Sequence, residues 1–151
     1  MTNEKTTKEY WNERAKKGGS PQDLVLTSTY LEEFELETRK ILSLFKGCFA
    51  FDIGCGYGRL ADAFAPEKYA GFDFSEEMIK IAKEKNPKHH FFIEDMNTTL
   101  KQNSDKRIDI IFEAMCLSSF EMTPEQFRDK FKDYARIIIC FEPHDFRIFY
   151  I

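Results

Sequence analysis

The stretch FDIGCGYGR, from Phe51 to Arg59, decides the fold of this chain. It lies between the apolar run CFAFDI, which is typical of a strand, and a stretch from Leu60 to Ala65 with a helical pattern. Glycine recurs at positions 54, 56 and 58, which allows a tight turn from strand to helix. Side chains at positions 54 and 56 would obstruct the approach of the backbone to a ligand. The stretch therefore predicts a nucleotide-binding turn.

Outward from this turn, short apolar runs alternate with helical periodicity along the chain. Ser75 can cap a helix that Asn86-Pro87 ends, and a capping box from Thr123 to Gln126 opens a helix before the last long run. This alternation predicts βαβ units and a mainly parallel sheet. The expected strands are Cys48–Ile53, Tyr69–Phe74, His89–Glu94, Ile108–Met115 and Arg136–Glu142.

The two ends of the chain extend this core. Residues 1–46 are polar with helical periodicity and break at residues 18–21, so we expect two helices that cover the sheet or act as a lid. Residues 47–151 would form the core of what is one structural domain overall. The final run, Asp145–Ile151, suffices for one edge strand, which predicts a sheet shortened at its C-terminus. The apolar stripe of the second helix consists of Leu31, Phe34, Ile41, Leu42 and Phe45.

The composition limits the classes of function. The 151 residues, of which 42% are hydrophobic, fit one compact domain. The net charge is −4, whereas nucleic-acid binders depend on a basic surface, so we expect no nucleic-acid partner. The polar start lacks the apolar core of a secretion signal, and no apolar run approaches the ~18 residues of a membrane span, so we expect a cytoplasmic protein without a membrane partner. Four single cysteines favour buried thiols over a metal site.

The residue at position 59 separates two kinds of nucleotide site. A dinucleotide-binding turn needs G-x-G-x-x-G with a glycine at this position, and the chain has Arg59. Asp73 ends the second expected strand, ~20 residues after the turn, where a carboxylate can accept hydrogen bonds from both ribose hydroxyls. Alone, Asp73 would more often be a helix-capping or solvated residue, but its register with the glycine turn favours a ligand role. Asp95-Met96 follows the third expected strand at the same edge of the sheet.

These residues together resemble the first three motifs of the class I methyltransferases that depend on S-adenosylmethionine (SAM). The resemblance runs from about Tyr10 to Pro143 and implies a doubly wound, mainly parallel α/β sheet with SAM as cofactor and S-adenosylhomocysteine (SAH) as product. It implies that Asp52 orders the turn and the amino-acid end of the ligand, and that Asp73 holds the ribose. The remaining contacts implied for the cofactor are Gly54, Cys55, Gly56, Phe74, Met78, Asp95 and Met96.

The N-terminal string EYWNERAKK, from Glu9 to Lys17, resembles the entry helix of several small-molecule methyltransferases. The resemblance implies that Tyr10, Trp11 and Arg14 face the SAM carboxylate or close over the site, and an arginine can form a bidentate pair with a carboxylate. The alternative is an amphipathic surface helix that Trp11 anchors.

The segment after the fourth expected strand bears on the methyl acceptor. It lacks the (D/N/S)PP(Y/F) signature of enzymes that methylate amino groups of DNA, and no proline precedes Cys116 to suggest a nucleophile for cytosine. Removal of a proton from a hydroxyl acceptor would need a base. Four acidic or imidazole groups lie at strand ends, and we take Glu113 and His144 as the catalytic candidates, with Glu113 also near the cofactor. The four groups are Glu113, Glu142, His144 and Asp145.

The leading hypothesis is a SAM-dependent methyltransferase that acts on a hydroxyl or amine of a small molecule, such as a sugar or a related metabolite. The alternative is a SAM-binding partner subunit without turnover, and a nicotinamide-dependent oxidoreductase is disfavoured by Arg59. Both faces of the expected edge strand Asp145–Ile151 carry apolar groups, which predicts self-association into a homodimer unless the N-terminal helices cover them.

Overall fold

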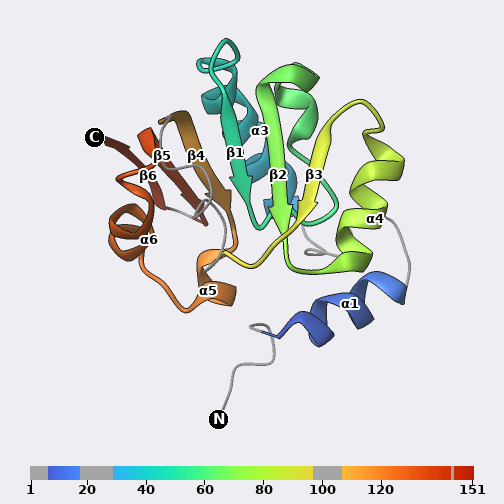
Figure 1. The fold of residues 1–151 in the computed structure, drawn as a ribbon. Helices are drawn as coiled ribbons and strands as arrows, with labels where there is room; N and C mark the ends of the chain where they lie inside the picture. The colour runs from blue at the N-terminus through green and yellow to red at the C-terminus, as the bar shows by residue number, and fades with distance from the viewer. Residues whose placement is uncertain (1–6, 18–28, 97–106, 144) are drawn as a thin grey trace.

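The computed structural model describes residues 7–17, 29–96, 107–143 and 145–151, and it shows one sheet with helices on both faces (Figure 1). In these residues, six strands form the sheet in the order β3-β2-β1-β4-β5-β6. β1 to β5 run parallel and β6 is antiparallel to β5, which confirms the predicted α/β architecture. The strands are β1 Ala50–Ile53, β2 Tyr69–Asp73, β3 His90–Ile93, β4 Ile108–Ala114, β5 Ala135–Glu142 and β6 Asp145–Tyr150.

The helices divide between the two faces of the sheet, because neighbouring residues of a strand point to opposite faces. Ile110 of β4 and Ile139 of β5 pack in one cluster with helices α3 (Thr29–Ser43) and α4 (Glu76–Lys85). Ile111 and Ile138, one residue away, pack in the other cluster with α6 (Pro124–Phe131). Both central strands are therefore covered on both faces, as a doubly wound sheet requires.

The carboxyl ends of the central strands meet at one edge of the sheet. Asp52 of β1 lies opposite Gly71 of β2 and Phe112 of β4, so these three strands end at similar heights. Helices α1 (Lys8–Lys16) and α5 (Leu117–Phe120) lie at this edge, which is the lower edge in Figure 1. The edge is where ligands bind in open α/β sheets.

Helix boundaries follow the predicted caps. The Ser75 side chain accepts a hydrogen bond from the backbone N–H of Met78 at the start of α4. Thr123 and Gln126 form both hydrogen bonds of the capping box at the start of α6. Each cap satisfies backbone donors that the first helical turn leaves without partners.

The stretch from Leu60 to Ala65 corrects one prediction. It contains the short 3-10 helix η2 (Ala61–Ala63) instead of an α-helical run, and a second 3-10 turn, η3 (Pro66–Lys68), follows. Phe64 donates to the carbonyl of Ala61, three residues back, and is already extended. A residue before proline disfavours the helical conformation, and Ala65 is extended as well, with ψ 147°. Too few residues therefore remain after the glycine turn for an α-helix.

Strand β6 pairs with β5 as the predicted edge strand, and both of its faces are partly covered. Phe146 packs against Phe34 of α3, with ring centroids 5.7 Å apart, and Arg128 of α6 lies 5.1 Å from the Phe149 ring centroid. Ile148 and Tyr150 stay exposed, and no further strand pairs with β6 in the described part of the chain. The N-terminal region thus covers part of this strand, as the alternative reading of the sequence allowed. No helix among the described residues has the length and apolar character to cross a membrane.

Helix α3 offers a direct test of the core. Leu42 is completely buried whereas Leu36, on the same helix, is 55% exposed. We predict that Leu42→Ala lowers the free energy of unfolding by about 2–5 kcal/mol, because it removes buried methyl groups and leaves a cavity. Leu36→Ala is the matched control and should change it by about 0.5 kcal/mol or less. Urea unfolding measures both, and equal effects of the two substitutions would contradict the packing of α3 described above.

Candidate functional site

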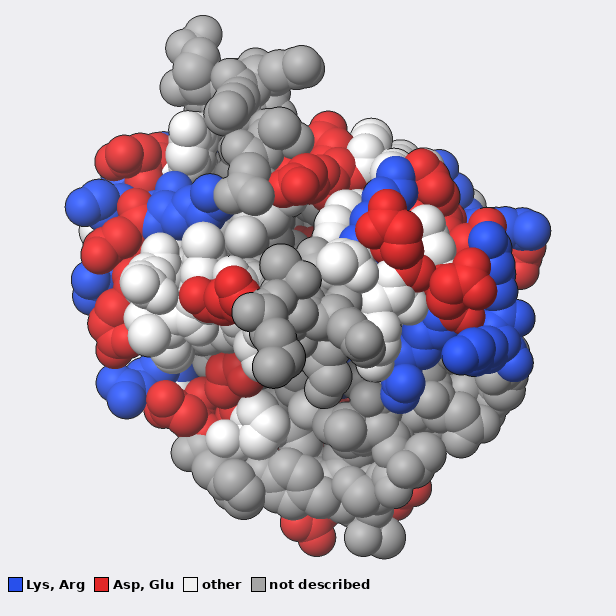
Figure 2. Space-filling model, turned by 90° about the horizontal axis from the view of Figure 1, so that it is seen from below, with Lys and Arg blue, Asp and Glu red and all other residues white. Residues whose placement is uncertain are grey.

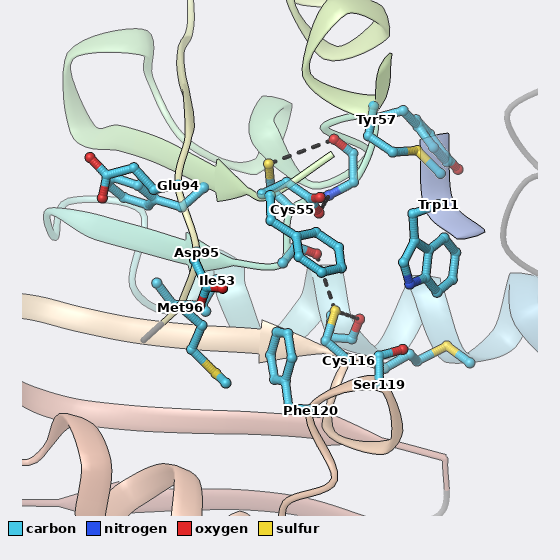
Figure 3. Close-up of a pocket in the computed structure, with 18 of the residues that line it drawn as sticks. Trp11, Ile53, Cys55, Tyr57, Glu94, Asp95, Met96, Cys116, Ser119 and Phe120 are labelled. Carbon is cyan, nitrogen blue, oxygen red and sulfur yellow. Dashed lines mark hydrogen bonds between the residues drawn. The ribbon is translucent and has the colours of Figure 1, made fainter. Parts of the chain in front are cut away.

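A pocket of about 250 Å³ lies at the carboxyl edge of the sheet, between the loops that follow β1, β2, β3 and β4 (Figure 3). Its walls are mainly apolar, with a few polar groups that converge on it, which is typical of a small-molecule site. Many of the residues predicted from the sequence line this pocket. They are Trp11, Gly54, Cys55, Gly56, Asp73, Phe74, Met78, Asp95 and Met96.

The glycine turn after β1 forms the floor of the pocket. Gly54 has φ +73°, and a Cβ on it would lie 2.8 Å from Cys116 Sγ and 2.9 Å from Phe120 Cζ. Gly56 has φ +56°, but a Cβ there would meet nothing within 4 Å. Position 54 therefore needs glycine for the packing of the protein itself. Gly56 lines the pocket and a side chain there would meet open space, which fits a backbone that a ligand approaches.

Asp73 ties the glycine turn to the end of β2. Its Oδ2 accepts a hydrogen bond from the Gly56 N–H at 2.9 Å, and its Oδ1 accepts one from the Ser75 N–H at 2.9 Å. Burial raises the pKa of Asp73 to about 6, and the hydrogen bonds from Ser75 and Gly56 oppose that shift. A carboxylate has about four acceptor positions, so Asp73 can still accept hydrogen bonds from a ligand in the pocket.

Asp52 lies beneath the turn and does not line the pocket. It is 2% exposed, and its Oδ2 accepts a hydrogen bond from the Tyr69 hydroxyl at 2.7 Å. Burial raises the pKa of Asp52 to about 7, while Tyr69 and the charge of Arg59 lower it. The structure thus gives Asp52 a place below the loop, and direct contact with a ligand stays a prediction.

Arg59 lines the pocket and was used in the sequence only to exclude a dinucleotide site. Its side chain is 10% exposed, and its Nη2 donates to the carbonyl of Ala114 at 3.3 Å. Nη1 lies 3.9 Å from Glu35 Oε2 and is buried without a hydrogen-bond partner in the described part of the chain. Nη1 lies toward Glu35, so the observation that favours a ligand contact for Arg59 is its place in the pocket wall, where a guanidinium could pair with a carboxylate. The sequence signal for it was a cation directly after the last glycine of the turn.

Helix α1 brings a second residue that the sequence did not reveal. Asn12 Oδ1 accepts hydrogen bonds from Ser75 Oγ at 2.6 Å and from the Glu77 N–H at 3.3 Å. Asn12 therefore fastens α1 to the first turn of α4 and holds Trp11 at the pocket. Tyr10 packs edge-on against the Trp11 ring, with centroids 5.2 Å apart, but neither Tyr10 nor Arg14 lines the pocket.

The catalytic candidates from the sequence do not meet in the pocket. Glu113 is completely buried and outside the pocket wall, so its expected contact with cofactor or substrate is corrected by the structure. The reason is the alternation of side chains along β4: Ala114 faces the cavity, so Glu113 points to the opposite face of the sheet, beside Cys140 of β5. His144 lies outside the described residues. Among those residues, no group of three or more His, Cys, Asp or Glu could hold a metal ion.

The comparisons with known proteins agree with this geometry. The model of the methyltransferase domain family matches residues 50–138, from β1 into β5. No curated protein matches the chain.

Solved structures share the fold at low sequence identity. The plantazolicin methyltransferase BpumL, in complex with SAH, is 21% identical with a TM-score of 0.58, over 91% of this chain and 56% of that chain. Magnesium protoporphyrin IX methyltransferase (ChlM) from Synechocystis PCC 6803, with bound SAM, is 17% identical with a TM-score of 0.58, over 93% of this chain and 76% of that chain. The chain thus spans little more than half the length of the plantazolicin enzyme. Because the family model covers more than half of its residues, the chain belongs to the methyltransferase domain family.

Proposed function

We propose that this protein is a SAM-dependent methyltransferase that transfers a methyl group to a hydroxyl or amine of a small molecule, for example a sugar or a related metabolite. One observation carries the proposal. The glycine turn after β1, Asp73 at the end of β2 and Asp95 after β3 line a single cavity at the carboxyl edge of the sheet. SAM is the cofactor proposed for this cavity, with SAH as the product.

The residues of the pocket fit the parts of SAM. Asp73 has acceptor positions for ribose hydroxyls. Asp95 and Met96 line the same cavity, and we assign them to the polar edge and the apolar face of the adenine ring. Arg59 lines the pocket, and we assign it to the carboxylate at the amino-acid end of the cofactor. Open space beside Gly56 gives the cofactor access to the backbone between these two ends.

The chain contributes position and charge to the reaction. When bound, SAM supplies an electrophilic methyl group on a positively charged sulfur. The acidic side chains of the pocket stabilise positive charge, and they lose their pKa elevation when a cation is near. Met115, Ser119 and Phe120 form the wall beyond the glycine turn, and we propose that the acceptor lies against them.

A second candidate function is a SAM-binding subunit without turnover. The observation in its favour is that Glu113, the expected base, is sealed from the pocket. The open edge of β6 is our candidate for self-association in either case. An assay for SAH formation from SAM with a panel of sugars, amines, azole peptides and porphyrins tests the proposal. Turnover with one class supports the enzyme, whereas tight SAM binding without turnover on any panel member supports the second candidate.

A matched pair of glycine substitutions separates ligand access from folding. We predict that Gly56→Val abolishes SAM binding in a folded protein, because its side chain enters the open space on the pocket side. Gly54→Ala should instead lower the melting temperature, because its Cβ collides with Cys116 and Phe120. Both substitutions also carry strain from a positive φ, about 1–2 kcal/mol for alanine and more for the β-branched valine. Calorimetric titration and thermal unfolding check the pair, and normal SAM binding by Gly56→Val would contradict the proposed ligand path.

The role of Arg59 can be tested with part of the cofactor. We predict that Arg59→Gln weakens SAM and SAH binding about tenfold to a hundredfold, the scale of ~1.5–3 kcal/mol for a hydrogen bond to a charged group. Binding of 5′-methylthioadenosine, which lacks the amino-acid end, should stay the same. Calorimetric titration measures the three ligands on both proteins. An equal loss for all of them would show that Arg59 supports the pocket as a whole and does not contact the carboxylate.

A further inference from the structure

The turn between β4 and α5 forms one wall of the pocket. Met115 and Cys116 of this turn line the cavity together with Ser119 and Phe120 of α5. Figure 3 shows Cys116, Ser119 and Phe120 in this wall. Met115 has φ 63°, a left-handed conformation that side chains other than glycine rarely adopt. Such a conformation persists only where its surroundings hold it. The wall therefore needs interactions that hold the backbone of residues 115–117 in place.

Two glutamates on neighbouring strands provide these interactions. Glu113 Oε2 accepts a hydrogen bond from the Cys116 N–H at 2.9 Å. Glu142 Oε1, at the end of β5, accepts one from the Leu117 N–H at 3.1 Å. Consecutive backbone amides of the turn are thus held by two side chains from β4 and β5. The pair lies behind the wall and does not line the pocket.

The buried pair cannot carry two charges without loss. Glu113 Oε1 is buried and, as an ionised oxygen, has no hydrogen-bond partner among the described residues. A proton on Glu113 gives this oxygen a partner, because the acid can then donate a hydrogen bond to the neighbouring Glu142 carboxylate. Burial first, and then the charge of Glu142, raise the pKa of Glu113 well above its usual range.

The groups that face the pair reinforce this state. Asp52 on β1 acts on Glu113, and Asp145 on β6 acts on Glu142, both as negative charges that favour the protonated form. The Cys140 thiol on β5 contacts Glu113, and burial raises the pKa of that thiol out of the physiological range. Glu125 of α6 also faces Cys140. Arg147 pairs with both Asp145 and Glu125 and partly offsets their charge, but no cation is among the described groups that act directly on Glu113.

We propose that Glu113 and Glu142 are positioning residues that share one proton and hold the wall of residues 115–120 in place. Loss of the shared proton at alkaline pH puts two negative charges side by side in the interior and releases the turn. The shared proton itself does not depend on the proposed function. Its consequence does, because a wall that is released at alkaline pH matters for catalysis only if the methyl acceptor lies against it. The pair is not the base of the reaction, because neither carboxyl lines the cavity.

Hydrogen exchange of the Cys116 and Leu117 amides, measured by NMR on the full chain, tests the proposal. We expect their protection, corrected for intrinsic exchange, to fall as the pH rises into the alkaline range, by about tenfold for each pH unit above the pKa of the pair, because the protonated fraction falls by that factor. Glu113→Gln keeps an acceptor for Cys116 and a permanent donor for Glu142, so its protection should not change with pH. Glu125→Gln, which removes a nearby exposed charge without touching the turn, should keep the wild-type profile.

The outcomes are distinct. Protection of the wild-type amides that does not change with pH overturns the shared proton, whether or not the variants fold. The same fall with pH in Glu113→Gln also overturns it, because that variant has no proton to lose at this position. SAM binding near pH 6 is a separate readout. Its absence contradicts the proposed function and leaves the exchange result valid.

Discussion

The whole site depends on the carboxylate of Asp73, which accepts hydrogen bonds from two backbone N–H groups. One hydrogen bond holds Gly56 in the turn after β1, and the other holds Ser75 at the start of α4. Ser75 in turn caps α4 and donates to Asn12 of α1. A single acid therefore joins the floor of the pocket, the end of β2 and the helix that carries Trp11. Loss of this charge would disturb all three at once.

Around this centre the protein buries more negative than positive charge. Burial raises the pKa values of Asp52, Asp73 and Glu113, so each keeps a proton more readily than it would in water. On the pocket side, Arg59 and a cationic ligand would reduce this excess of negative charge. On the far side of the wall formed by residues 115–120, the Glu113–Glu142 pair reduces it by retaining a proton. Figure 2, which views the molecule from the carboxyl edge of the sheet, shows acidic and basic side chains mixed over the visible described surface. On the described part of this face the charges are mixed, whereas the buried ionisable groups around the site are mainly acidic.

Much of the fold and of the pocket wall could be predicted from the sequence, because both follow from local patterns. Apolar runs predicted the parallel strands, and the spacing of glycines and acids predicted residues such as Gly56, Asp73 and Met96, which now line one cavity. The features that the sequence did not predict depend on how distant elements pack against one another. The face of the sheet to which Glu113 points depends on which residues of β4 face the helices on each side, and the use of Asn12 as a cap for α4 depends on how α1 docks.

Two further differences have a physical cause of the same kind. The stretch after the glycine turn has helical residues, but the proline at position 66 and the early burial of Phe64 leave only a 3-10 turn. In the sequence, Arg59 only departed from the dinucleotide-binding pattern, and its place in the pocket wall is what suggests a ligand contact. Local preference gives way here to tertiary contacts.

The most direct measurement is the affinity for 5′-methylthioadenosine as a function of pH, for the wild type and for Asp73→Asn. This ligand contains the ribose but not the amino-acid end, so its binding reports on Asp73. Because the carboxylate and not the acid would accept the ribose hydroxyls, the wild-type affinity should fall as the pH drops below about 6, the pKa of Asp73. In folded Asp73→Asn the affinity should be lower and should not change with pH. A wild-type affinity that is the same at pH values on both sides of this pKa would contradict the central role of Asp73.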